Sequence, residues 1–314
     1  MNIALDMMGG DYAPGQAMKG VQHYLSESVS PAFLLLIGDQ ERLTPLLSQY
    51  SIPEKSIKLV HAASVIDMHE HPTKALKEKK DSSIAIGFHL LATGKADAFI
   101  SAGNTGAMMV GALFSIKAIE GVQRPTISTI IPRENGKTGL LLDVGLNSDC
   151  KPEVLNQFAM LGSLYAQYIL GIDEPRTGLV NIGEEEGKGN ILAQAAYPLL
   201  KENKEIRFIG NVEGRDVLLD KADVMVCDGF TGNILLKLLE SLFEITERQQ
   251  IHHAYFDRFN FENYGGTPVL GVAKPVIIGH GISHGKAFKN MIALAEKIIL
   301  TDLLGKMKNS FEGN

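Results

Sequence analysis

The stretch that decides the fold is Phe99-Ile-Ser-Ala-Gly-Asn-Thr-Gly-Ala-Met-Met-Val-Gly111, in which an apolar strand end passes through a short turn into a helix. The turn, Ser101–Gly106, contains two glycines that let the backbone approach a ligand closely. Asn104 and Thr105 can cap the helix or donate hydrogen bonds, and the free N–H groups at the helix start favour an anion. The turn therefore predicts an anion site, although a capped strand-to-helix turn without any ligand would look the same.

A related turn recurs later in the chain, at Asp228-Gly229-Phe230-Thr231-Gly232-Asn233. It follows an apolar strand, Val224–Val226, and precedes a predicted helix over Ile234–Gln249. One such turn is weak evidence. Two in one chain favour a phosphate-type ligand held by backbone groups and small side chains.

Apolar runs of strand length alternate with helix-length segments from one end of the chain to the other. Such alternation, with nearly continuous apolar strands, predicts an α/β fold, an α/β/α sandwich with a mostly parallel sheet. No linker or repeat interrupts it, so we expect a single α/β domain over residues 1–314, with the helical segment at about 234–262 as a protruding or dimer-forming element. The expected strands are Asn2–Asp6, Phe33–Gly38, Ser56–Val60, Ala96–Ser101, Thr126–Pro132, Leu140–Val144, Arg176–Ile182, Glu205–Ile209, Val224–Asp228 and Val276–His280. The expected helices include Gln16–Ser26, Ser82–Ala92, Thr105–Ile119, Glu153–Leu170, Asn190–Leu200 and Ile234–Gln249.

Ligands of open parallel sheets bind outside the carboxyl ends of the strands. Glycine together with Asp, Asn, Glu, Thr or His occurs at many of these ends, which predicts one polar, backbone-rich cleft. The strand exits are Asp6–Asp11, Ser101–Gly106, Asp143–Asn147, Asn181–Glu186, Gly210–Gly214, Asp228–Asn233 and His280–Gly281.

Composition narrows the classes of function. The 314 residues are 45% hydrophobic and 21% charged, as in an ordinary globular protein, and the formal net charge of -6 argues against nucleic acid as the main partner. The two cysteines, Cys150 and Cys227, lack metal-ligand spacing, which favours a reducing compartment. Asp6 and Asp11 do not suit a signal peptide, and no apolar run reaches membrane-spanning length, so we expect a cytoplasmic protein.

Several familiar motifs are absent or incomplete. No Gly-x-Gly-x-x-Gly follows the first strand, and Gly183–Lys188 resembles a P-loop ending with too short a spacing, so a nucleotide-driven reaction is disfavoured. Gly281–Gly285 reads Gly-x-Ser-x-Gly, as in α/β-hydrolases, but no histidine follows His284 to complete a triad. The histidines at 69, 71, 252, 253, 280 and 284 have no supporting ligand spacing, so we expect no metal ion. Cys227 fits a buried core residue better than a nucleophile.

Two surface features suggest partners. Lys74, Lys77, Lys79 and Lys80 form a basic run that is either a solvated face or a docking site for an acidic protein. The helix over Ile234–Gln249 carries a wide apolar face that must bury against the core, a second subunit, an acyl chain or a bilayer surface. Its leucines 235, 239 and 242 fall on one stripe.

Taken together, these segments resemble the PlsX family, the acyl-carrier-protein:phosphate acyltransferases of bacterial phospholipid synthesis. The matching segments span nearly the whole chain in consistent order: Ala4–Asp11, Ser101–Met108, Leu142–Asn147, Asn181–Gly189, Gly210–Asp216, Val226–Lys237, Tyr264–Gly271 and His280–Gly281. The chain departs from the family where only 30 residues separate Asn233 from Tyr264, fewer than in the family's helical hairpin, and where Leu146 replaces the more common alanine.

The resemblance implies a fold similar to the isocitrate dehydrogenases and phosphotransacetylases, a homodimer, and transfer of a long-chain fatty acyl group from acyl carrier protein to inorganic phosphate. The product, an acyl phosphate, would pass to a membrane glycerol-3-phosphate acyltransferase. No cofactor is implied, because the thioester and the acyl phosphate are both activated. The family's hairpin is linked to peripheral contact with the membrane, and its shortening here makes that contact a weaker expectation.

The strand exits and the resemblance together select the candidate site residues. We expect Asp228, Asn233 and His280 to act in catalysis. Phosphate is already a nucleophile near neutral pH, and a thiol of pKa about 8.5 is a tolerable leaving group, so positioning and oxyanion stabilisation would suffice. The substrate-binding candidates are Asp6, Gly9, Gly10, Asp11, Ser101, Gly103, Asn104, Thr105, Gly106, Asn147, Asn181, Glu184, Lys188, Asn211, Glu213, Thr231, Lys237 and Tyr264.

Three other functions stay open. A phosphotransacetylase would use short acyl-CoA rather than acyl carrier protein. A metal- and NAD-dependent decarboxylating dehydrogenase would need clustered arginines and aspartates, whereas the arginines at 133, 176, 207 and 215 are dispersed in the sequence. A non-catalytic phosphate sensor would bind phosphate without thioester turnover.

Overall fold

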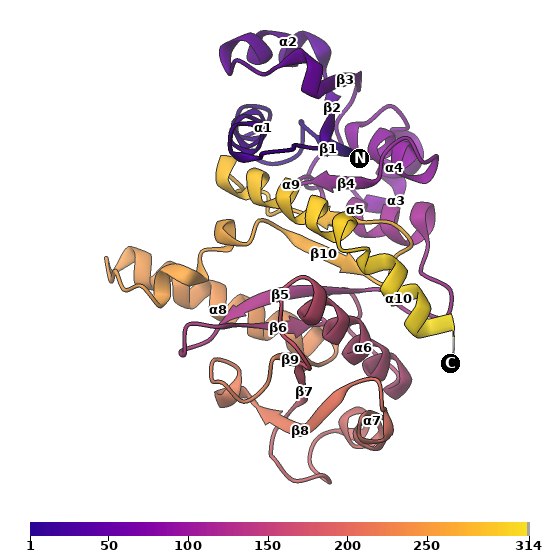
Figure 1. Ribbon diagram of the computed structural model, residues 1–314, viewed down its shortest axis with the longest axis vertical. Coiled ribbons are helices and arrows are strands. Elements are labelled where there is room, and N and C mark those ends of the chain that lie inside the picture. Colours follow the sequence, from indigo (N-terminus) through magenta and orange to yellow (C-terminus); the bar gives the residue numbers. More distant parts are fainter. Residues whose placement is uncertain (313–314) are drawn as a thin grey trace. The chain divides into compact units, whose positions relative to one another are not determined.

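A computed structural model of the chain describes residues 1–312. The chain forms two compact units, coloured along the sequence in Figure 1. Unit 1 comprises Met1–Ala118 and Phe261–Leu304, and unit 2 comprises Ile119–Asn260 and the chain from Gly305 onward. Each unit contains its own strands and its own candidate residues.

Unit 1 is built on strands in the order β3-β2-β1-β4-β11-β10. All neighbours in this series are parallel except β10 and β11, which are antiparallel. The central strands are almost continuously apolar and buried, as expected for a sheet covered on both faces. The strands are β1 (Asn2–Asp6), β2 (Phe33–Gly38), β3 (Ile57–His61), β4 (Ala98–Ser101), β10 (Thr267–Leu270) and β11 (Val276–Ile278).

Helices cover both faces of this sheet, and Figure 1 shows α1 and α4 on opposite sides of β1. Helix α1 packs closely on α9, because a Cβ at Gly20 would lie only 2.3 Å from Cβ of Phe288. Gly87 of α4 leaves room in the same way for the ring of Phe99 on β4. The helices are α1 (Gly15–Glu27), α2 (Gln40–Gln49), α3 (Pro72–Glu78), α4 (Ser83–Ala92), α5 (Thr105–Gly111), which continues as the π-helical turn η2 (Ala112–Ile116), and α9 (Gly285–Leu300). The short 3-10 helices η1 (Glu54–Ser56) and η5 (Phe261–Asn263) complete the unit.

Unit 2 is built on strands in the order β5-β6-β9-β7-β8. The first pair is an antiparallel hairpin, and the remaining neighbours are parallel. The strands are β5 (Thr126–Pro132), β6 (Thr138–Leu142), β7 (Arg176–Asn181), β8 (Arg207–Glu213) and β9 (Val224–Val226). The helices are α6 (Pro152–Tyr168), α7 (Ile191–Glu202), α8 (Gly229–Arg248) and the short 3-10 helices η3 (Gly214–Asp216) and η4 (Phe256–Phe259). A last helix, α10 (Leu303–Glu312), begins at the end of unit 1.

An ion-pair network links the amino ends of β7 and β9 to the loop of the β5–β6 hairpin. The guanidinium of Arg133 is almost fully buried and lies 2.7 Å from Asp220 and 2.9 Å from Asp223. Arg176 contacts the same two carboxylates at 2.6 and 2.9 Å. Burial opposes the ionisation of Asp223, but the hydrogen bonds from Arg176 and Arg133 outweigh it and lower the pKa of Asp223 to about 2.

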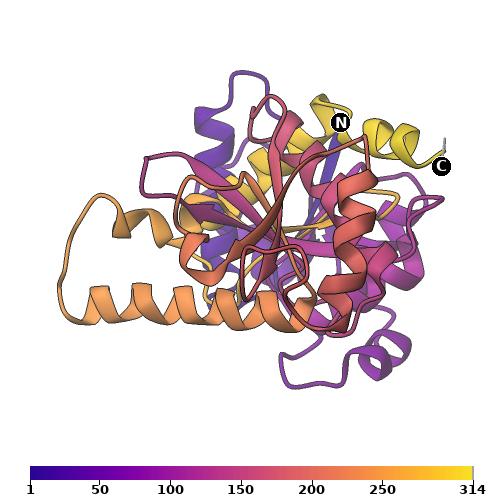
Figure 2. The same ribbon diagram turned by 90° about the horizontal axis from the view of Figure 1, so that it is seen from below.

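Helix α8 is long and mostly exposed. Within its twenty residues only Gly229, Gly232 and Thr246 are buried. Figure 2 shows it as the long orange helix, with the segment that follows it turning back beside it. Along the described part of the chain, residues 1–312, no helix combines the length and the apolar character that a bilayer crossing requires.

The sequence predicted the element types well, with differences at some boundaries. The helix predicted over Ile234–Gln249 begins instead at Gly229, because Asp228 caps it and accepts the backbone N–H of Thr231. Residues 229–233 are therefore its first turn and not a separate turn before it. The helix predicted over Thr105–Ile119 ends as a regular helix at Gly111 and continues as a π-helix.

The strand predicted at Glu205–Ile209 runs over Arg207–Glu213. Gly210 has a φ of 94°, and the pairing of β7 with β8 shifts register beside it, which masks the continuing strand in the sequence. Most of the supposed exit at Gly210–Gly214 is therefore strand. The strand predicted at Leu140–Val144 is β6, which runs over Thr138–Leu142 and leaves Asp143 in the exit loop.

Candidate functional site

Three adjacent parallel strands of unit 1, β1, β4 and β11, end at the same edge of the sheet. Asp6 ends β1 and is fully buried. One of its carboxylate oxygens accepts the N–H groups of Met8 and Gly9, at 2.9 and 3.1 Å. The other accepts the hydroxyl of Ser101, at 2.7 Å, and that hydroxyl in turn accepts the N–H of Gly103. Asp6 and Ser101 thus hold the two loops together.

Burial raises the pKa of Asp6, and the hydrogen bond from Ser101 partly offsets the effect. The loops that Asp6 joins approach each other at backbone distance, since a Cβ on Gly9 would lie 2.5 Å from the nitrogen of Gly103. A side chain at Gly9 would therefore push the two loops apart, which explains the glycine there.

Asn104 caps α5 and also fastens a second loop. Its Oδ1 accepts the N–H of Ala107, at 2.9 Å, as a helix cap does. Its Nδ2 donates to the carbonyls of Asp67 and Glu70, at 2.8 and 3.1 Å, and so holds the loop that precedes α3. Both ends of this amide are therefore engaged within the protein.

Thr105 and Gly106 follow Asn104 at the start of α5. The side chain of Thr105 is exposed and Gly106 is half-buried. A Cβ at Gly106 would lie 2.4 Å from Cγ of Pro72, so this glycine allows α5 to pack on α3.

The exit of β11 lies beside the Gly9–Asp11 loop. The N–H of Asp11 donates to the carbonyl of Gly281, at 2.8 Å, and Gly10 adopts a φ of 101° against the same carbonyl. His280 is exposed, and its ring centroid lies 5.0 Å from that of Phe261. Tyr264 is half-buried, and its N–H donates to the carbonyl of Phe261. Unit 1 therefore brings the candidates Asp6, Gly9, Gly10, Asp11, Ser101, Gly103 and His280 to one edge.

Unit 2 repeats the buried aspartate. Asp143, just after β6, is fully buried. Its Oδ1 accepts the N–H groups of Gly145 and Leu146, each at 3.1 Å. Its Oδ2 accepts both the backbone N–H and the side-chain amide of Asn147, at 2.7 Å. Burial raises the pKa of Asp143, and the hydrogen bonds from Asn147 oppose that rise.

The start of α8 packs directly on this loop. The N–H of Gly229 donates to the carbonyl of Asn147 at 2.7 Å, and a Cβ on Gly232 would lie 1.8 Å from the carbonyl oxygen of Asp143. Asp228 accepts both the N–H and the hydroxyl of Thr231, at 2.8 and 3.0 Å. Asn233 is exposed beside the same loop, because a Cβ on Gly145 would lie 3.2 Å from its Oδ1.

Two amides order the loop after β7. Asn181 donates to the carbonyl of Lys188 and to Oδ1 of Asn211, each at 3.1 Å. Asn211, almost fully buried, donates to the carbonyl of Glu185 at 2.8 Å. The ammonium of Lys188 is on an exposed residue of this loop. Both amides therefore shape the loop.

The acidic candidates nearby lie in ion pairs. Lys221 contacts Glu184 at 2.6 Å and Asp216 at 2.8 Å. Glu213 is paired with Arg215. Burial by itself would raise the pKa of Asp216, but the hydrogen bond from Lys221 opposes this effect, and the pKa of Asp216 is lowered.

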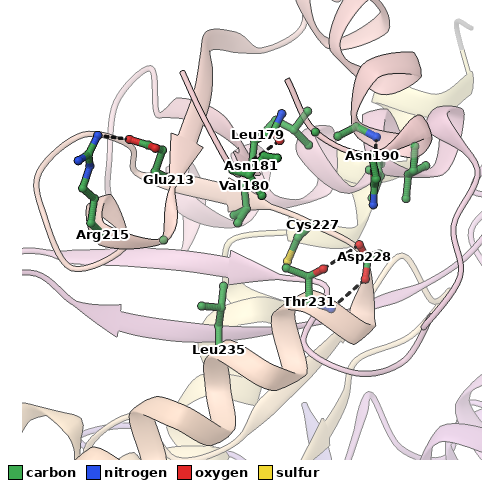
Figure 3. Close-up of a pocket in the computed structure, with 16 residues that line it drawn as sticks. Leu179, Val180, Asn181, Asn190, Glu213, Arg215, Cys227, Asp228, Thr231 and Leu235 are labelled. Carbon is green, nitrogen blue, oxygen red and sulfur yellow. Dashed lines mark hydrogen bonds and ion pairs between the residues drawn. The ribbon is translucent and has the colours of Figure 1, made fainter. Parts of the chain in front are cut away.

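A pocket of about 850 Å³ opens at this edge of unit 2. Half of its lining residues are apolar, and Asp228 and Thr231 line it together with Glu213 and Arg215 (Figure 3). No local pattern in the sequence predicts the pocket, because its walls come from five separate segments of the chain. The lining is Leu155, Leu179–Ile182, Gly189, Asn190, Leu192, Ala193, Glu213–Arg215, Cys227, Asp228, Thr231 and Leu235.

The two side chains that could act as a nucleophile in place of the substrate, Ser283 and Cys227, are buried. Ser283, the serine of the Gly-x-Ser-x-Gly match, is 2% exposed, and Cys227 is 3% exposed. Burial raises the pKa of Cys227 well above its usual value and raises that of Cys150 to about 12. Neither thiol is therefore disposed to ionise near neutral pH.

The candidate cations differ in whether they form ion pairs with neighbouring carboxylates. Lys79 contacts Glu70 at 2.6 Å, and Lys237 contacts Glu240 at 2.7 Å. Lys74, Lys77 and Lys80 are exposed. Lys74 and Lys77 lie on α3, a helix that was not expected from the sequence.

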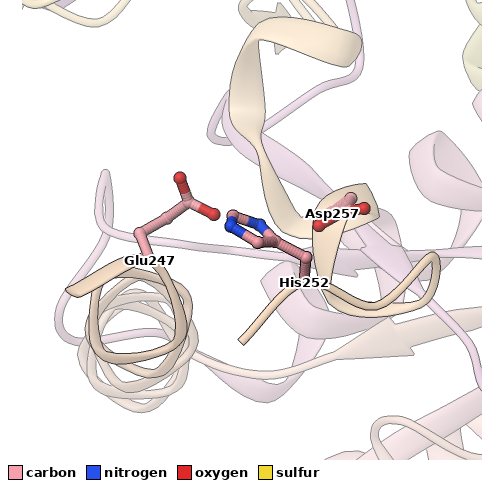
Figure 4. Close-up of side chains that lie close together, drawn as sticks. All are labelled: Glu247, His252 and Asp257. Carbon is pink, nitrogen blue, oxygen red and sulfur yellow. The ribbon is translucent and has the colours of Figure 1, made fainter. Parts of the chain in front are cut away.

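Three exposed side chains at the end of the α8 segment gather closely, although the sequence spacing gave no metal site. Ligand atoms of Glu247, His252 and Asp257 lie within 4.8 Å of one another (Figure 4). Two carboxylates and an imidazole are ligand types that divalent metals accept. A second acidic group, Glu184, Glu213 and Asp216, is engaged by Lys221 and Arg215.

Solved structures define the fold of the chain. It aligns with a phosphotransacetylase from Streptococcus pyogenes with a TM-score of 0.66 and 17% identity, over 95% of this chain and 94% of that one. A branched-chain phosphotransacylase from Enterococcus faecalis gives a TM-score of 0.64 at 17% identity, over 95% and 98%. The chain thus has the α/β fold that these phosphotransacylases share, as the resemblance implied.

Sequence relatives define the family. The chain is 43% identical to the phosphate acyltransferase of Dictyoglomus thermophilum over 98% of its own length and 96% of that protein. It is 42% identical to the phosphate acyltransferase of Halothermothrix orenii over 98% of each. Residues 1–306 match the family described as fatty acid synthesis protein, and the chain belongs to this family of acyltransferases. The predicted family and enzyme class are confirmed.

Proposed function

We propose that this enzyme transfers a long-chain fatty acyl group from acyl carrier protein to inorganic phosphate and so supplies acyl phosphate for phospholipid synthesis. The observation that carries the proposal is the hydrogen bonding of the strand exits. The polar atoms of Asp6, Ser101, Asp143 and Asn147 are engaged within the protein, either in their own loops or with neighbouring ones. Polar groups that shape loops in this way leave the substrate to supply the nucleophile. The names of the sequence relatives support phosphate in that role.

The reaction needs no covalent enzyme intermediate. A phosphate oxygen attacks the thioester carbonyl carbon, a C–O bond forms, and the C–S bond breaks as the thiolate leaves and takes up a proton. The thiol has an ordinary pKa of about 8.5, so it is a tolerable leaving group. Holding both reactants in place can contribute roughly 7–11 kcal/mol to lowering the barrier.

We assign phosphate to the Ser101–Gly106 turn of unit 1. The exposed hydroxyl of Thr105 and the backbone at the start of α5 are suitable donors, whereas the N–H of Gly103 already donates to Ser101. Asp6 and Asn104 then act as positioning residues, because their polar atoms already hold the surrounding loops. His280, exposed at the neighbouring strand end, is the candidate proton donor for the leaving thiolate.

In unit 2 we assign Asp228, Thr231 and Asn233 to the acyl thioester. Thr231 and Asp228 line the pocket, and Asn233 lies at the adjoining loop. Lys188 is an exposed cation of this region and suits the phosphate of the carrier's pantetheine arm.

Acyl carrier protein is acidic, so its docking on a chain of net charge -6 requires a local basic patch. We propose Lys74, Lys77 and Lys80 for this patch, because they are exposed, whereas Lys79 is held by Glu70. Replacing Lys77 and Lys80 by Glu should raise the KM for acyl carrier protein and leave that for phosphate unchanged. An unchanged KM for the carrier would place docking elsewhere, with Arg215, Arg248 and Arg258 as the next candidates.

A homodimer through α8 is also part of the proposal. Large apolar side chains on this helix remain exposed, among them Phe230 at 64%, Ile234 at 52% and Leu238 at 64%. An apolar stripe of this kind is typical of a subunit interface. Light scattering of the purified protein tests it, since a monomer at micromolar concentration would contradict a stable dimer.

The decisive test of the activity uses purified protein, palmitoyl-acyl carrier protein and phosphate, with acyl phosphate as the measured product. We expect phosphate-dependent turnover without nucleotide, and the released acyl phosphate should acylate glycerol 3-phosphate when a membrane acyltransferase is added. Turnover with short acyl-CoA but not with the carrier protein would replace this function by that of a phosphotransacetylase. Phosphate binding without turnover of either thioester would indicate a sensor.

A further inference from the structure

We propose that the pocket in unit 2 receives the hydrocarbon tail of the acyl thioester. This assignment rests on the proposed acyl transfer and goes beyond it by locating the tail. It names the wall that α7 contributes, and Leu192 in particular, as the determinant of acyl-chain length.

The size and lining of the pocket suit an alkyl chain. Its volume of about 850 Å³ lies within the range of roughly 300–1,000 Å³ that is usual for small-ligand sites. Leu155, Leu179 and Cys227 line it and are almost fully buried. Val180 and Leu192 add further apolar surface. Covering a hydrocarbon with such residues removes apolar surface from water, which is the main source of affinity for an uncharged chain.

Six of the sixteen residues that line the pocket are polar or charged, and most of these side chains are engaged in hydrogen bonds or ion pairs. Asn181 bonds to Asn211 and to the carbonyl of Lys188, and Asp228 accepts two hydrogen bonds from Thr231. Figure 3 shows Glu213 and Arg215 directed toward each other at one end of the pocket. Groups that are already satisfied offer little to a polar ligand, whereas they do not oppose a hydrocarbon.

The charge of the lining argues against an anionic occupant. Two carboxylates, Glu213 and Asp228, face one guanidinium, Arg215, which is itself paired with Glu213. A phosphodiester or a nucleotide placed here would meet net negative charge. An uncharged tail would not.

Helix α8 both borders this pocket and carries exposed apolar residues that we assign to the dimer. Leu235 lines the pocket and is half-buried, whereas Leu238, three residues further on and about 60° around the helix axis, is 64% exposed. The apolar face of the helix is therefore wide, and Leu235 is the part of it that borders the pocket.

The test changes the volume of the pocket in both directions. Leu192→Trp should narrow it and Leu192→Ala should enlarge it, while Ile191→Trp adds similar bulk at the neighbouring residue, which is 88% exposed and does not line the pocket. For each variant, kcat/KM is measured with butanoyl, octanoyl and hexadecanoyl thioesters of the carrier that the wild type accepts. Each buried methylene group contributes about fourfold to affinity.

We expect Leu192→Trp to lower kcat/KM for the hexadecanoyl thioester by about tenfold or more relative to the butanoyl thioester. Leu192→Ala should shift the preference toward the longer chain, and Ile191→Trp should keep the wild-type profile. Equal losses at all three lengths, as a site for the pantetheine arm would give, or unchanged profiles in both Leu192 variants, would overturn the assignment. Circular dichroism confirms folding, and Leu192→Ala keeps the test decisive if the tryptophan variant is unfolded.

The same measurements distinguish a failure of the proposed acyl transfer from a failure of the pocket assignment. If the protein does not transfer acyl groups to phosphate, the wild type turns over none of the three thioesters. If only the pocket assignment is wrong, the wild type is active and its chain-length profile is insensitive to Leu192.

Discussion

Each unit contains a buried aspartate at the end of a parallel strand, and the two loops that these aspartates hold differ in an instructive way. Asp6 bridges two strands, because its second oxygen accepts the hydroxyl of Ser101 on β4. Asp143 satisfies its second oxygen within its own loop, through Asn147. The carboxylate of Asp6 therefore fixes one strand exit against another. The carboxylate of Asp143 fixes a single loop, on which the start of α8 packs.

The helices that follow show the same contrast. The cap of α5, Asn104, also holds the loop at residues 67–70, so this exit of unit 1 is tied on two sides. The cap of α8, Asp228, bonds Thr231 of its own helix and lines a pocket. Compact, backbone-rich surroundings suit a small anion in unit 1, and the pocket of unit 2 suits a bulkier group.

The largest effect is expected from closing the contact between α8 and the Asp143 loop. In Gly232→Ala the new Cβ would lie 1.8 Å from the carbonyl oxygen of Asp143, so the helix must move. We expect a loss of about 3 kcal/mol in the free energy of unfolding or failure to fold, measured by urea denaturation. Gly187→Ala, with open space around its Cβ, is the control. Equal stabilities of the two variants would show that the helix start is not fixed by this contact.

Asn104→Ala tests the double role of the cap in unit 1. A lost helix cap alone costs about 1 kcal/mol, as expected for Asp39→Ala on α2, whose side chain accepts only the N–H of Glu41. Asn104→Ala also releases the loop at residues 67–70 and should raise the KM for phosphate by about tenfold or more. If both variants had the same phosphate kinetics, the tie to this loop would have no part in substrate binding.

The dependence of stability on pH below neutrality should distinguish Asp223 from the two buried loop aspartates, Asp6 and Asp143. The folded-state pKa of Asp223 is about 2, below its ordinary value, so its contribution to stability is present above that ordinary value and is lost as pH falls toward about 2. Asp223→Asn should therefore be less stable than the wild type at neutral pH and show a flatter acid limb in thermal melts.

Asp6 and Asp143 have raised pKa values, so the sign reverses: the folded state binds the proton more tightly, and stability falls as pH rises through the raised value. Asp143→Asn should remove the part of this slope that Asp143 contributes. An acid limb that steepens in Asp223→Asn would contradict the assignment.

The smallest effect is expected at the exposed cations. Lys237→Met removes an exposed ion pair with Glu240 and should change the free energy of unfolding by no more than about 0.5 kcal/mol. Lys188→Met should have a similarly small effect on stability but should raise the KM for one substrate selectively. Equal changes in both KM values, or none, would exclude Lys188 from substrate binding.

Much of the fold could be predicted from the sequence. The apolar runs at Asn2–Asp6, Phe33–Gly38 and Thr126–Pro132 coincide with β1, β2 and β5, because each is buried and lies between clear breaks. The strand β10 was missed, since two preceding glycines and Pro268 conceal it, although it pairs with the next strand, β11. The start of α8 was placed late because Gly229 and Gly232 resemble a turn, although they are required by close packing on the Asp143 loop.

The hydrogen bonding of the candidate residues was not predictable from the sequence. Asp6, Ser101 and Asn104 were read as ligands of a substrate, yet their polar atoms bond to loops that are distant in sequence. Such partners depend on tertiary contacts between residues 6 and 101, or 104 and 67, which no local pattern contains. The pocket was missed for the same reason, because its lining spans Leu155 to Leu235.

The anchored loops have a thermodynamic consequence for ligand binding. A flexible loop that orders around a ligand loses conformational entropy, and that loss reduces affinity. Here the N–H groups of Met8 and Gly9 are fixed by Asp6 before a ligand arrives, and those of Gly145 and Leu146 are fixed by Asp143. The entropy of these loops was lost when the chain folded, so a ligand that bound them would lose little further conformational entropy.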